Sequence, residues 1–289
     1  MINTKTKLFG VIGHPVAHSL SPALHNWMLK HFDFNAVYVA FDIEPRLLRN
    51  AFKGMQAFGI AGLNVTLPHK ASVVDYISFA SPQVRHLGVA NTIKYTESGL
   101  QGYVTDPYGF TESLGSQKEK FQDASVLILG AGGSAQSILY ALKDLECSEI
   151  MLYNRTFEKA LQLAAKASEQ LGIGSVSVLH SEQLKDAVND AEIIVNTTSI
   201  GMHPDTGNPL PFDGILKPSH FVYDLIYNPL QTPLLRMAEK AGASWQHGLG
   251  MLIFQGLRSL QIWTDTDVQL NSNDLELLTA HLIREMQNS

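Results

Sequence analysis

The sequence has 289 residues, of which 45% are hydrophobic and 17% charged, and its net charge is -6 at neutral pH. A chain of this length usually divides into two domains. Its acids and bases are interspersed, without the Lys/Arg cluster that nucleic-acid binding requires. It shows no secretory signal and no apolar run as long as a membrane-spanning helix. A single cysteine, Cys147, excludes an internal disulfide and fits a reducing compartment. We therefore expect a cytoplasmic protein that binds neither nucleic acid nor membrane.

Strands and helices alternate in the first part of the chain, which favours a mostly parallel α/β sheet. Strands are predicted at Leu8–Ile12, Val37–Phe41 and Gly62–Thr66. Helices are predicted at Pro22–Phe32 and Pro45–Phe58. Further on, Asn91–Tyr95 and Leu100–Val104 flank a glycine-containing turn and predict a hairpin, which we expect at an edge of the sheet.

The alternation restarts more regularly after residue 125. Strands are predicted at Val126–Leu129, Ile150–Tyr153, Ile193–Asn196 and Val222–Ile226, and helices at Ser134–Leu145, Glu158–Leu171 and Pro233–Ala241. The apolar strands indicate a sheet buried on both faces. Two helices, Met251–Trp263 and Asp274–Gln287, end the chain with no strand after them. We expect them to return to the first domain, so that residues 1–106 and 249–289 form one discontinuous domain and residues 107–248 the other.

A glycine-rich loop follows the apolar strand at residues 126–129 and opens the next helix. It reads Gly130-Ala131-Gly132-Gly133-Ser134-Ala135, which matches the G-x-G-x-x-G/A pattern in the required strand–helix context. Gly130 permits the tight turn, Gly132 lets the backbone approach a pyrophosphate, and Ala135 lets the helix pack close to the strand. The helix N-terminus offers N–H groups to phosphates. The alternative is a glycine-rich turn without a ligand. The pattern favours a Rossmann-type, doubly wound dinucleotide-binding domain.

The segment after the next strand indicates which dinucleotide is bound. An NAD site usually places an acidic residue there, whereas this chain has Asn154-Arg155-Thr156. The Arg155 guanidinium can pair with a 2′-phosphate, which Asn and Thr can also hydrogen-bond. Lys159, about one helical turn on, could add a second positive charge, although a solvated surface position is an equal alternative for it. The cofactor is therefore predicted to be NADP.

Polar residues cluster at the ends of the predicted strands, where α/β proteins bind ligands. Together with the glycine loop they form a series of motifs in a fixed order: Gly13-His14-Pro15, His18-Ser19-Leu20-Ser21-Pro22, Asn64-Val65-Thr66-Leu67-Pro68-His69-Lys70, Ala90-Asn91-Thr92, Thr105-Asp106, Asn196-Thr197-Thr198-Ser199-Ile200-Gly201-Met202, Tyr223-Asp224-Leu225-Ile226-Tyr227-Asn228-Pro229 and Gly248-Leu249-Gly250-Met251-Leu252. In these motifs the chain resembles the shikimate dehydrogenase family over essentially its whole length.

The resemblance implies reversible, NADPH-dependent reduction of 3-dehydroshikimate to shikimate in aromatic biosynthesis. A ketone that accepts hydride becomes an alkoxide, so a side chain must donate a proton or stabilise the charge. Lys70 matches the family's catalytic lysine and Asp106 its aspartate. Which of the two is the formal acid/base is left open by the sequence. A lone lysine would more often be a solvated surface residue.

The same resemblance implies the ligands of the substrate and of the cofactor. The substrate ligands are Ser19, Ser21, Asn64, Thr66, Asn91, Tyr227 and Gln255. The cofactor contacts beyond the glycine loop and residues 154–159 are Thr197, Thr198, Ser199, Met202, Leu225, Gly248 and Met251. Ser19 and Ser21 precede Pro22, the expected first residue of a helix, where hydroxyls and N–H groups can bind a carboxylate. Ser21 could instead be a plain N-cap. Tyr227 could be a packing aromatic and Gln255 a helix-surface residue.

Two residues depart from the family pattern beside the predicted catalytic aspartate. Val104 stands where the family has a polar residue, and Pro107 where it has glycine. A proline is tolerated in the first turn of a helix, so we interpret Pro107 as a local variation. The departures keep two alternatives open. One is a quinate/shikimate dehydrogenase or a paralogue for a related cyclitol acid, and the other is a catalytically silent metabolite-binding module.

The remaining histidines and the cysteine are not predicted to form a reactive site. His14, His18 and His25 fall close together, but their spacing suits no common metal site and no cysteine partner accompanies them. We therefore predict no metal and expect capping or structural roles for these rings. Cys147 is predicted to pack as a small apolar residue. The partner is expected to be a small-molecule substrate, with a homodimer as a further expectation.

Overall fold

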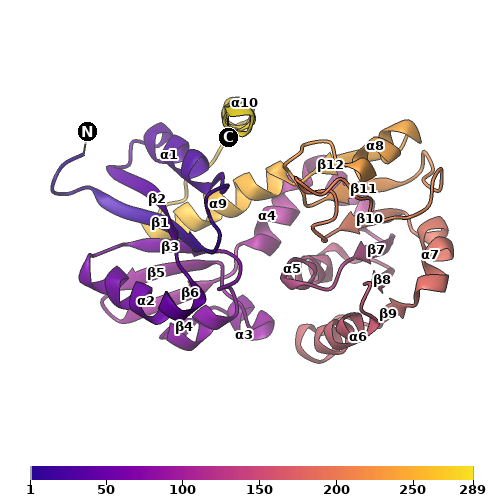
Figure 1. Cartoon of the computed structure of the whole chain (residues 1–289), viewed down its shortest axis with the longest axis horizontal. Coiled ribbons are helices and arrows are strands. Elements are labelled where there is room, and N and C mark those ends of the chain that lie inside the picture. Colours follow the sequence, from indigo (N-terminus) through magenta and orange to yellow (C-terminus); the bar gives the residue numbers. More distant parts are fainter. Residues whose placement is uncertain (1, 289) are drawn as a thin grey trace. The chain divides into compact units, whose positions relative to one another are not determined.

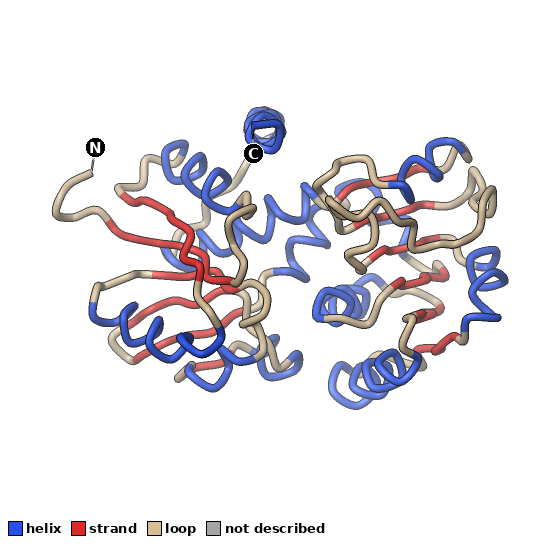
Figure 2. The backbone as a smooth tube through the Cα atoms, in the orientation of Figure 1, coloured by secondary structure: helices blue, strands red, loops and turns tan. Residues whose placement is uncertain are grey.

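The computed structural model describes residues 2–288, which divide into two compact units (Figure 1). The first unit contains the residues up to Thr105 and those from Ile253 onward, and the second is the continuous segment Asp106–Leu252. Each unit contains a six-stranded sheet accompanied by helices (Figure 2). Within the described residues, no helix has both the length and the apolar character needed to cross a membrane.

The sheet of the first unit is mixed, with the strand order β2-β1-β3-β5-β6-β4. Its strands are β1 (Lys7–Gly13), β2 (Ala36–Asp42), β3 (Gly62–Val65), β4 (Phe79–Ala80), β5 (Thr92–Thr96) and β6 (Gly99–Tyr103). The predicted hairpin is confirmed as β5 and β6, which pair antiparallel. Its predicted edge position is wrong, because β4 pairs with β6 and takes the edge. A strand of two residues has too few positions to show a period of two.

The helices of the first unit come from both ends of the chain. They are α1 (Ser21–His31), α2 (Leu48–Ala57), α3 (Pro82–Leu87), α10 (Ser272–Asn288) and, from Ile253 onward, α9 (Leu249–Thr264). The predicted helix at 45–58 begins as a separate 3₁₀ turn, Pro45–Leu47. Trp263 of α9 stacks on Phe9 of β1 with 4.9 Å between ring centroids, and α10 packs on α1. Residues more than 250 positions apart in the sequence thus build one core.

The sheet of the second unit is parallel throughout, with the strand order β12-β11-β10-β7-β8-β9. Its strands are β7 (Ser125–Leu129), β8 (Glu149–Tyr153), β9 (Val176–Leu179), β10 (Ile193–Asn196), β11 (Phe221–Asp224) and β12 (Ser244–His247). Counted along the unit, the spatial order is third, second, first, fourth, fifth and sixth, which is the doubly wound order. The predicted Rossmann-type topology is confirmed.

The helices of this unit are shorter than the sequence pattern suggests at several ends. They are α4 (Asp106–Ser113), α5 (Gly133–Leu142), α6 (Phe157–Lys166), α7 (Leu184–Asp190) and α8 (Pro233–Lys240). The helix predicted at 134–145 ends in a 3₁₀ turn, Lys143–Leu145, and the one predicted at 158–171 ends in a π turn, Ala167–Leu171. The 3₁₀ turn is tighter than an α-helical turn and the π turn is wider, and both keep the buried apolar face of the helix before them.

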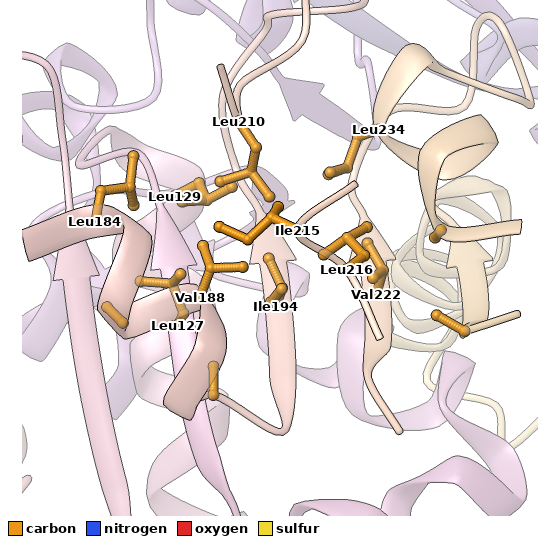
Figure 3. Packing of buried hydrophobic residues seen from close by; sticks show 14 of the residues in the cluster. Leu127, Leu129, Leu184, Val188, Ile194, Leu210, Ile215, Leu216, Val222 and Leu234 are labelled. Carbon is orange, nitrogen blue, oxygen red and sulfur yellow. The ribbon is translucent and has the colours of Figure 1, made fainter. Parts of the chain in front are cut away.

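The central strands of the second unit's sheet, β7, β10 and β11, are buried on both faces, as their apolar residues predict. On one face α7 and α8 cover the strands, and Figure 3 shows Leu184 and Val188 of α7 with Leu127 and Ile194 of the sheet. The opposite face carries the alternate residues of the same strands, since successive side chains of a strand point to opposite sides. There Tyr223 of β11 packs against Phe110 of α4, with 4.9 Å between ring centroids.

Candidate functional site

The predicted cofactor residues of the second unit lie at the carboxyl edge of its parallel sheet. The loops after β7 and β10 are neighbours there, since Leu129 pairs with Asn196 across the two strands. In the doubly wound order this is the point where successive connections leave to opposite faces, and ligands bind in the crevice that results. The glycine loop begins at this point with Gly130.

Only glycine fits at position 130, because of both the backbone conformation and the neighbouring atoms. Its φ is +107°, a region that favours glycine. A Cβ at this position would lie 2.6 Å from Thr197 Oγ1 and 2.9 Å from Thr198 Cγ2. The Thr197 hydroxyl donates to Leu129 O at 2.8 Å, which holds it in that place. The structure therefore brings three predicted cofactor residues together, and only a residue without a side chain fits among them.

The rest of the glycine loop is open to solvent. Gly132, Gly133 and Ser134 are exposed, and a Cβ at either glycine would meet no atom within 4 Å. Helix α5 begins at Gly133, so the unpaired N–H groups of its first turn face this open space. Ala135 is fully buried, as expected for a residue that lets the helix pack closely. The loop therefore offers an accessible group of backbone donors, which suits a phosphate.

The loop after β8 adjoins the glycine loop, because Gly130 N donates to Tyr153 O at 2.8 Å. Within it the Asn154 amide donates to Thr156 O at 2.8 Å, which braces the turn before α6. Arg155 and Thr156 are exposed, and so is Lys159 in the first turn of α6. The two loops thus present the open glycine backbone and a guanidinium on the same edge of one sheet.

Two buried polar residues, Asn196 and Asp224, organise the loops after β10 and β11; both belong to the sequence motifs, but neither was predicted as a site residue. Asn196 Oδ1 accepts from Thr198 N at 3.0 Å and from its hydroxyl at 2.7 Å, while Asn196 Nδ2 donates to Asp224 Oδ1 at 2.9 Å. Burial raises the pKa of Asp224 to about 6, against the opposing effect of three hydrogen bonds, from the Thr232 hydroxyl, Ile226 N and Asn196. A polar residue ending each of two neighbouring buried strands was the available signal.

The remaining predicted residues of the second unit lie on the same edge or near it. Leu225 N donates to Asn196 O at 3.0 Å, and Gly248 N donates to Ile226 O at 3.0 Å. Met202 N closes a turn on Ser199 O at 3.1 Å, and both side chains are exposed. The other two predicted contacts, Tyr227 and Met251, are half-buried. Burial raises the pKa of Tyr227, so its hydroxyl remains a donor at neutral pH.

In the first unit, Ser19 and Ser21 lie at the start of α1. Ser21 N donates to Ser19 Oγ at 3.3 Å, and the Ser21 side chain hydrogen-bonds the Tyr38 hydroxyl. The N-cap of α1 is Leu20, without a side-chain cap, so the alternative of Ser21 as a plain N-cap is wrong. Pro22 was predicted as the first residue of the helix and is its second, still within the first turn. Both serines are half-buried, and the Ser19 hydroxyl lies beside the first N–H group of the helix.

Three of the predicted substrate ligands are joined by hydrogen bonds in the first unit. Asn64 Nδ2 donates to Asn91 O at 3.3 Å, and Asn91 Nδ2 donates to Thr105 Oγ1 at 3.0 Å. Thr105 N returns a bond to Asn91 Oδ1 at 2.8 Å, and its hydroxyl donates to Gln255 Oε1 at 3.3 Å. Thr105 is fully buried. The amides of Asn64, Asn91 and Gln255 are therefore oriented by one continuous network.

The predicted catalytic residues follow strands of the first unit's sheet. Lys70 is half-buried in the loop after β3, and its carbonyl accepts from Ala90 N at 2.8 Å, next to Asn91. Thr66 N donates to Ile12 O at 2.9 Å, at the end of β1. Asp106 is buried and begins α4. Pro107 therefore lies in the first turn of a helix, as predicted, where its missing N–H has no intrahelical partner to lose.

The histidines and Cys147 have structural surroundings. His14 Nδ1 lies 2.8 Å from Asp42 Oδ1, whereas His18 is exposed. His25 is buried, and loss of hydration lowers its pKa to about 3. Burial raises the pKa of the Cys147 thiol to about 11, which leaves little thiolate at neutral pH. In the described part of the chain, no group of three or more His, Cys, Asp or Glu side chains could hold a metal ion.

Comparison with known proteins gives consistent matches across the chain. Residues 11–93 match the family model of the shikimate dehydrogenase substrate binding domain, and residues 113–203 match that of shikimate/quinate 5-dehydrogenase. A shikimate dehydrogenase (NADP(+)) of Caldanaerobacter subterraneus is 42% identical over 263 residues, which cover 91% of this chain and 93% of that protein.

Solved structures show the same similarity. A crystal structure of a shikimate dehydrogenase in complex with NADP+ is 37% identical, with a TM-score of 0.87, and the match covers 99% of this chain and 98% of that one. The shikimate 5-dehydrogenase of Thermus thermophilus, solved with NADP(H) and shikimate, is 31% identical with a TM-score of 0.84. That match covers 96% of this chain and 100% of the other.

Proposed function

This chain belongs to the shikimate dehydrogenase family, and on that basis we propose that it catalyses the reversible, NADPH-dependent reduction of 3-dehydroshikimate to shikimate. The observation that carries the proposal is the identity of 42% to an NADP-dependent shikimate dehydrogenase across 91% of the chain. The motif residues of both units are present at the positions described above.

The residues at the carboxyl edge of the second sheet fit NADP. The exposed Gly132 and Gly133 leave open space in front of the first turn of α5, where backbone N–H groups can hold the pyrophosphate. Arg155, exposed after the neighbouring strand, can pair with the 2′-phosphate. When bound, NADPH supplies the hydride for the ketone. The chain's own task at this edge is to hold the pyrophosphate and the 2′-phosphate of the cofactor.

The substrate is proposed to bind to polar residues of the first unit. Ser19 and Ser21, at the N-terminal end of α1, can hold the carboxylate, because hydroxyls and unpaired N–H groups both donate to an anion. The amides of Asn64, Asn91 and Gln255 can hydrogen-bond the ring hydroxyls. Thr66 and Tyr227 are proposed to support the same substrate. Prior ordering of the three amides by the network reduces the entropy that binding would otherwise lose.

Lys70 and Asp106 are proposed to manage the proton. The alkoxide that forms on the ring needs a proton, which the Lys70 ammonium can donate. Asp106 can accept a hydrogen bond from the hydroxyl and keep its oxygen aligned. Comparing the pH profiles of kcat for Lys70→Ala and Asp106→Asn assigns the proton: the variant that loses its ionisation from the profile identifies the acid/base.

Oxidation of shikimate with NADP+, followed by absorbance of the reduced nicotinamide, tests the proposed activity. We expect turnover with NADP+ and a large loss of kcat in Lys70→Ala, with KM for shikimate changing much less, since the variant removes a transition-state interaction. The exposed Lys30 of α1 provides a matched control, because Lys30→Ala removes the same charge outside the proposed site. Absence of turnover in the unmodified protein would refute the proposal.

Quinate is a second candidate substrate, because the family model matched by residues 113–203 covers quinate as well as shikimate dehydrogenases. Val104 and Pro107, beside Asp106, are the departures that could alter the choice. Equal or better turnover of quinate under the same conditions would favour this alternative. Binding of shikimate without any turnover would instead indicate a metabolite-binding module.

We further propose a cytoplasmic location and a homodimeric assembly. The chain has one cysteine in 289 residues and so forms no internal disulfide, which suits a reducing compartment. Cell fractionation tests the location, and light scattering after gel filtration tests the assembly.

A further inference from the structure

Ser259 lies on the face of α9 that packs on the sheet of the first unit. It is one helical turn after Gln255 and one turn before Trp263, so the three side chains form a stripe along the helix. Trp263 anchors this stripe: its indole donates to Ile93 O at 2.9 Å and lies against Gly62, where a Cβ would overlap the ring. Ser259 is fully buried, and its hydroxyl therefore has a fixed position over the sheet.

The Ser259 hydroxyl contacts four groups that surround the proposed substrate ligands. Asn64 Nδ2 donates to Ser259 Oγ at 3.0 Å, and the Thr92 hydroxyl lies 2.8 Å away. Ser259 itself donates to Gln255 O at 3.0 Å, and the Thr105 hydroxyl lies at 3.4 Å. Ser259 thus joins helix α9 to both β3 and β5, and it is the point where the bonds of the network converge.

The hydrogen bonds of Ser259 and Tyr38 determine the orientation of the Asn64 amide. The single proton of Ser259 is directed to Gln255 O, so toward Asn64 the serine oxygen acts as an acceptor. The Asn64 amide must therefore turn its nitrogen to Ser259, and its oxygen then faces Tyr38, whose hydroxyl donates to it at 2.8 Å. Burial raises the pKa of Tyr38, so this donor keeps its proton. If the amide were reversed, Asn64 Oδ1 would face the acceptor oxygen of Ser259, and Asn64 Nδ2 would face the donor hydroxyl of Tyr38.

We infer that Ser259 is a positioning residue for the substrate site: its hydroxyl, together with Asn91 O, fixes the amide of Asn64 with Nδ2 toward these two acceptors and Oδ1 toward the Tyr38 hydroxyl. The inference rests on the proposed function for the assignment of Asn64 as a substrate ligand. Asn64 Oδ1 has a second lone pair that can accept from a ring hydroxyl.

The first test replaces Ser259 by alanine and measures both substrates. We expect KM for shikimate to rise about tenfold, the effect of one lost buried hydrogen bond that leaves its partner unsatisfied. KM for NADP+ should stay unchanged, because Ser259 contacts no residue of the proposed cofactor site. Thr264→Val is the matched control: the Thr264 hydroxyl makes the same kind of bond within α9, to Leu260 O at 2.8 Å, away from the network. It should change neither KM.

A second variant, Thr92→Val, removes the other hydroxyl beside Asn64. If both hydroxyls act by holding one amide, Thr92→Val should also raise KM for shikimate, and the double variant should be no worse than about the larger single effect. Additive effects, or a lowered melting temperature with an unchanged KM, would show that Ser259 only supports folding and would overturn the inference.

The amide of Asn64 can also be observed without any substrate. In protein labelled with ¹⁵N-asparagine, the side-chain protons of Asn64, assigned by loss of the signal in Asn64→Ala, should exchange slowly and become fast in Ser259→Ala but not in Thr264→Val. Equal exchange in all three proteins would overturn the inference. Failure of the unmodified protein to oxidise shikimate would instead remove the proposed function and leave the exchange result to decide the role of Ser259.

Discussion

His25 makes the first unit sensitive to acid. Its ring is buried between Tyr38 and Trp263, at centroid distances of 4.3 and 5.2 Å, and its pKa falls to about 3 from an ordinary 6.5. The pKa of His25 is lower in the folded than in the unfolded protein. The contribution of the neutral ring to the free energy of unfolding is therefore complete above pH 6.5 and is lost as the pH falls toward 3. Each pH unit within that window changes the free energy of unfolding by about 1.4 kcal/mol. Between pH 7.5 and 4.5 the loss is therefore about 3 kcal/mol.

The exchange His25→Phe tests this value, because phenylalanine keeps the ring and cannot take up a proton. Urea titrations at pH 7.5 and 4.5, followed by tryptophan fluorescence, give the free energy of unfolding at each pH. We expect the decrease between them to be about 3 kcal/mol smaller in the variant than in the unmodified protein. His18→Phe is the control, since that ring is exposed. An equal decrease in His25→Phe and the unmodified protein would refute the argument.

Three further predictions concern the second unit. Gly130→Ala should raise KM for NADPH and lower the free energy of unfolding by about 2 kcal/mol, since a residue with a side chain meets both the positive φ and Thr197; denaturant titration and kinetics check the two effects. Arg155→Ala should raise KM for NADPH about tenfold and leave KM for NADH unchanged, as expected for the loss of one charge-assisted bond, and an unchanged cofactor preference would contradict the 2′-phosphate assignment. Asp224 has a folded pKa of about 6, raised from 3.8, so its contribution to stability is complete below pH 3.8 and lost as pH rises through 6. This decline in the free energy of unfolding is about 3 kcal/mol. Asp224→Asn should remove it, and denaturant titrations across this pH range check the result.

The parts of the fold that the sequence predicts best are those with long apolar runs. The strands at 126–129 and 193–196 are buried on both faces and appear at the predicted residues, because only a central strand buries every side chain. The strands β9 and β12 escape prediction, since they are short, lie at the two edges of the sheet and carry exposed residues such as Ser177 and Ser244. A half-exposed strand of four residues has no pattern that separates it from a loop.

The residues of the proposed site also fall into those that the sequence reveals and those that it does not. The glycine loop and the residues that follow strand ends are visible as motifs because their chemistry depends on residues adjacent in sequence. Ser259 is different, since its bond to Asn64 joins residues 195 positions apart. No local pattern reveals such a partner. The spacing of four residues from Gln255 is the one sequence signal that was available, and it acquires meaning only when Gln255 is known to face the sheet.

The discontinuity of the first unit sets an order for folding during synthesis. The second unit is one uninterrupted segment and has all of its strands as soon as residue 252 has left the ribosome. The N-terminal part of the first unit is synthesised earlier, but Trp263 and Ser259 follow only after the second unit. Until then Phe9 lacks its contact with Trp263, and Asn64 lacks its hydrogen bond to Ser259. We therefore expect the N-terminal sheet to become native last, although it is synthesised first. A nonsense mutation at codon 253 would leave the second unit whole and the first without α10 and most of α9.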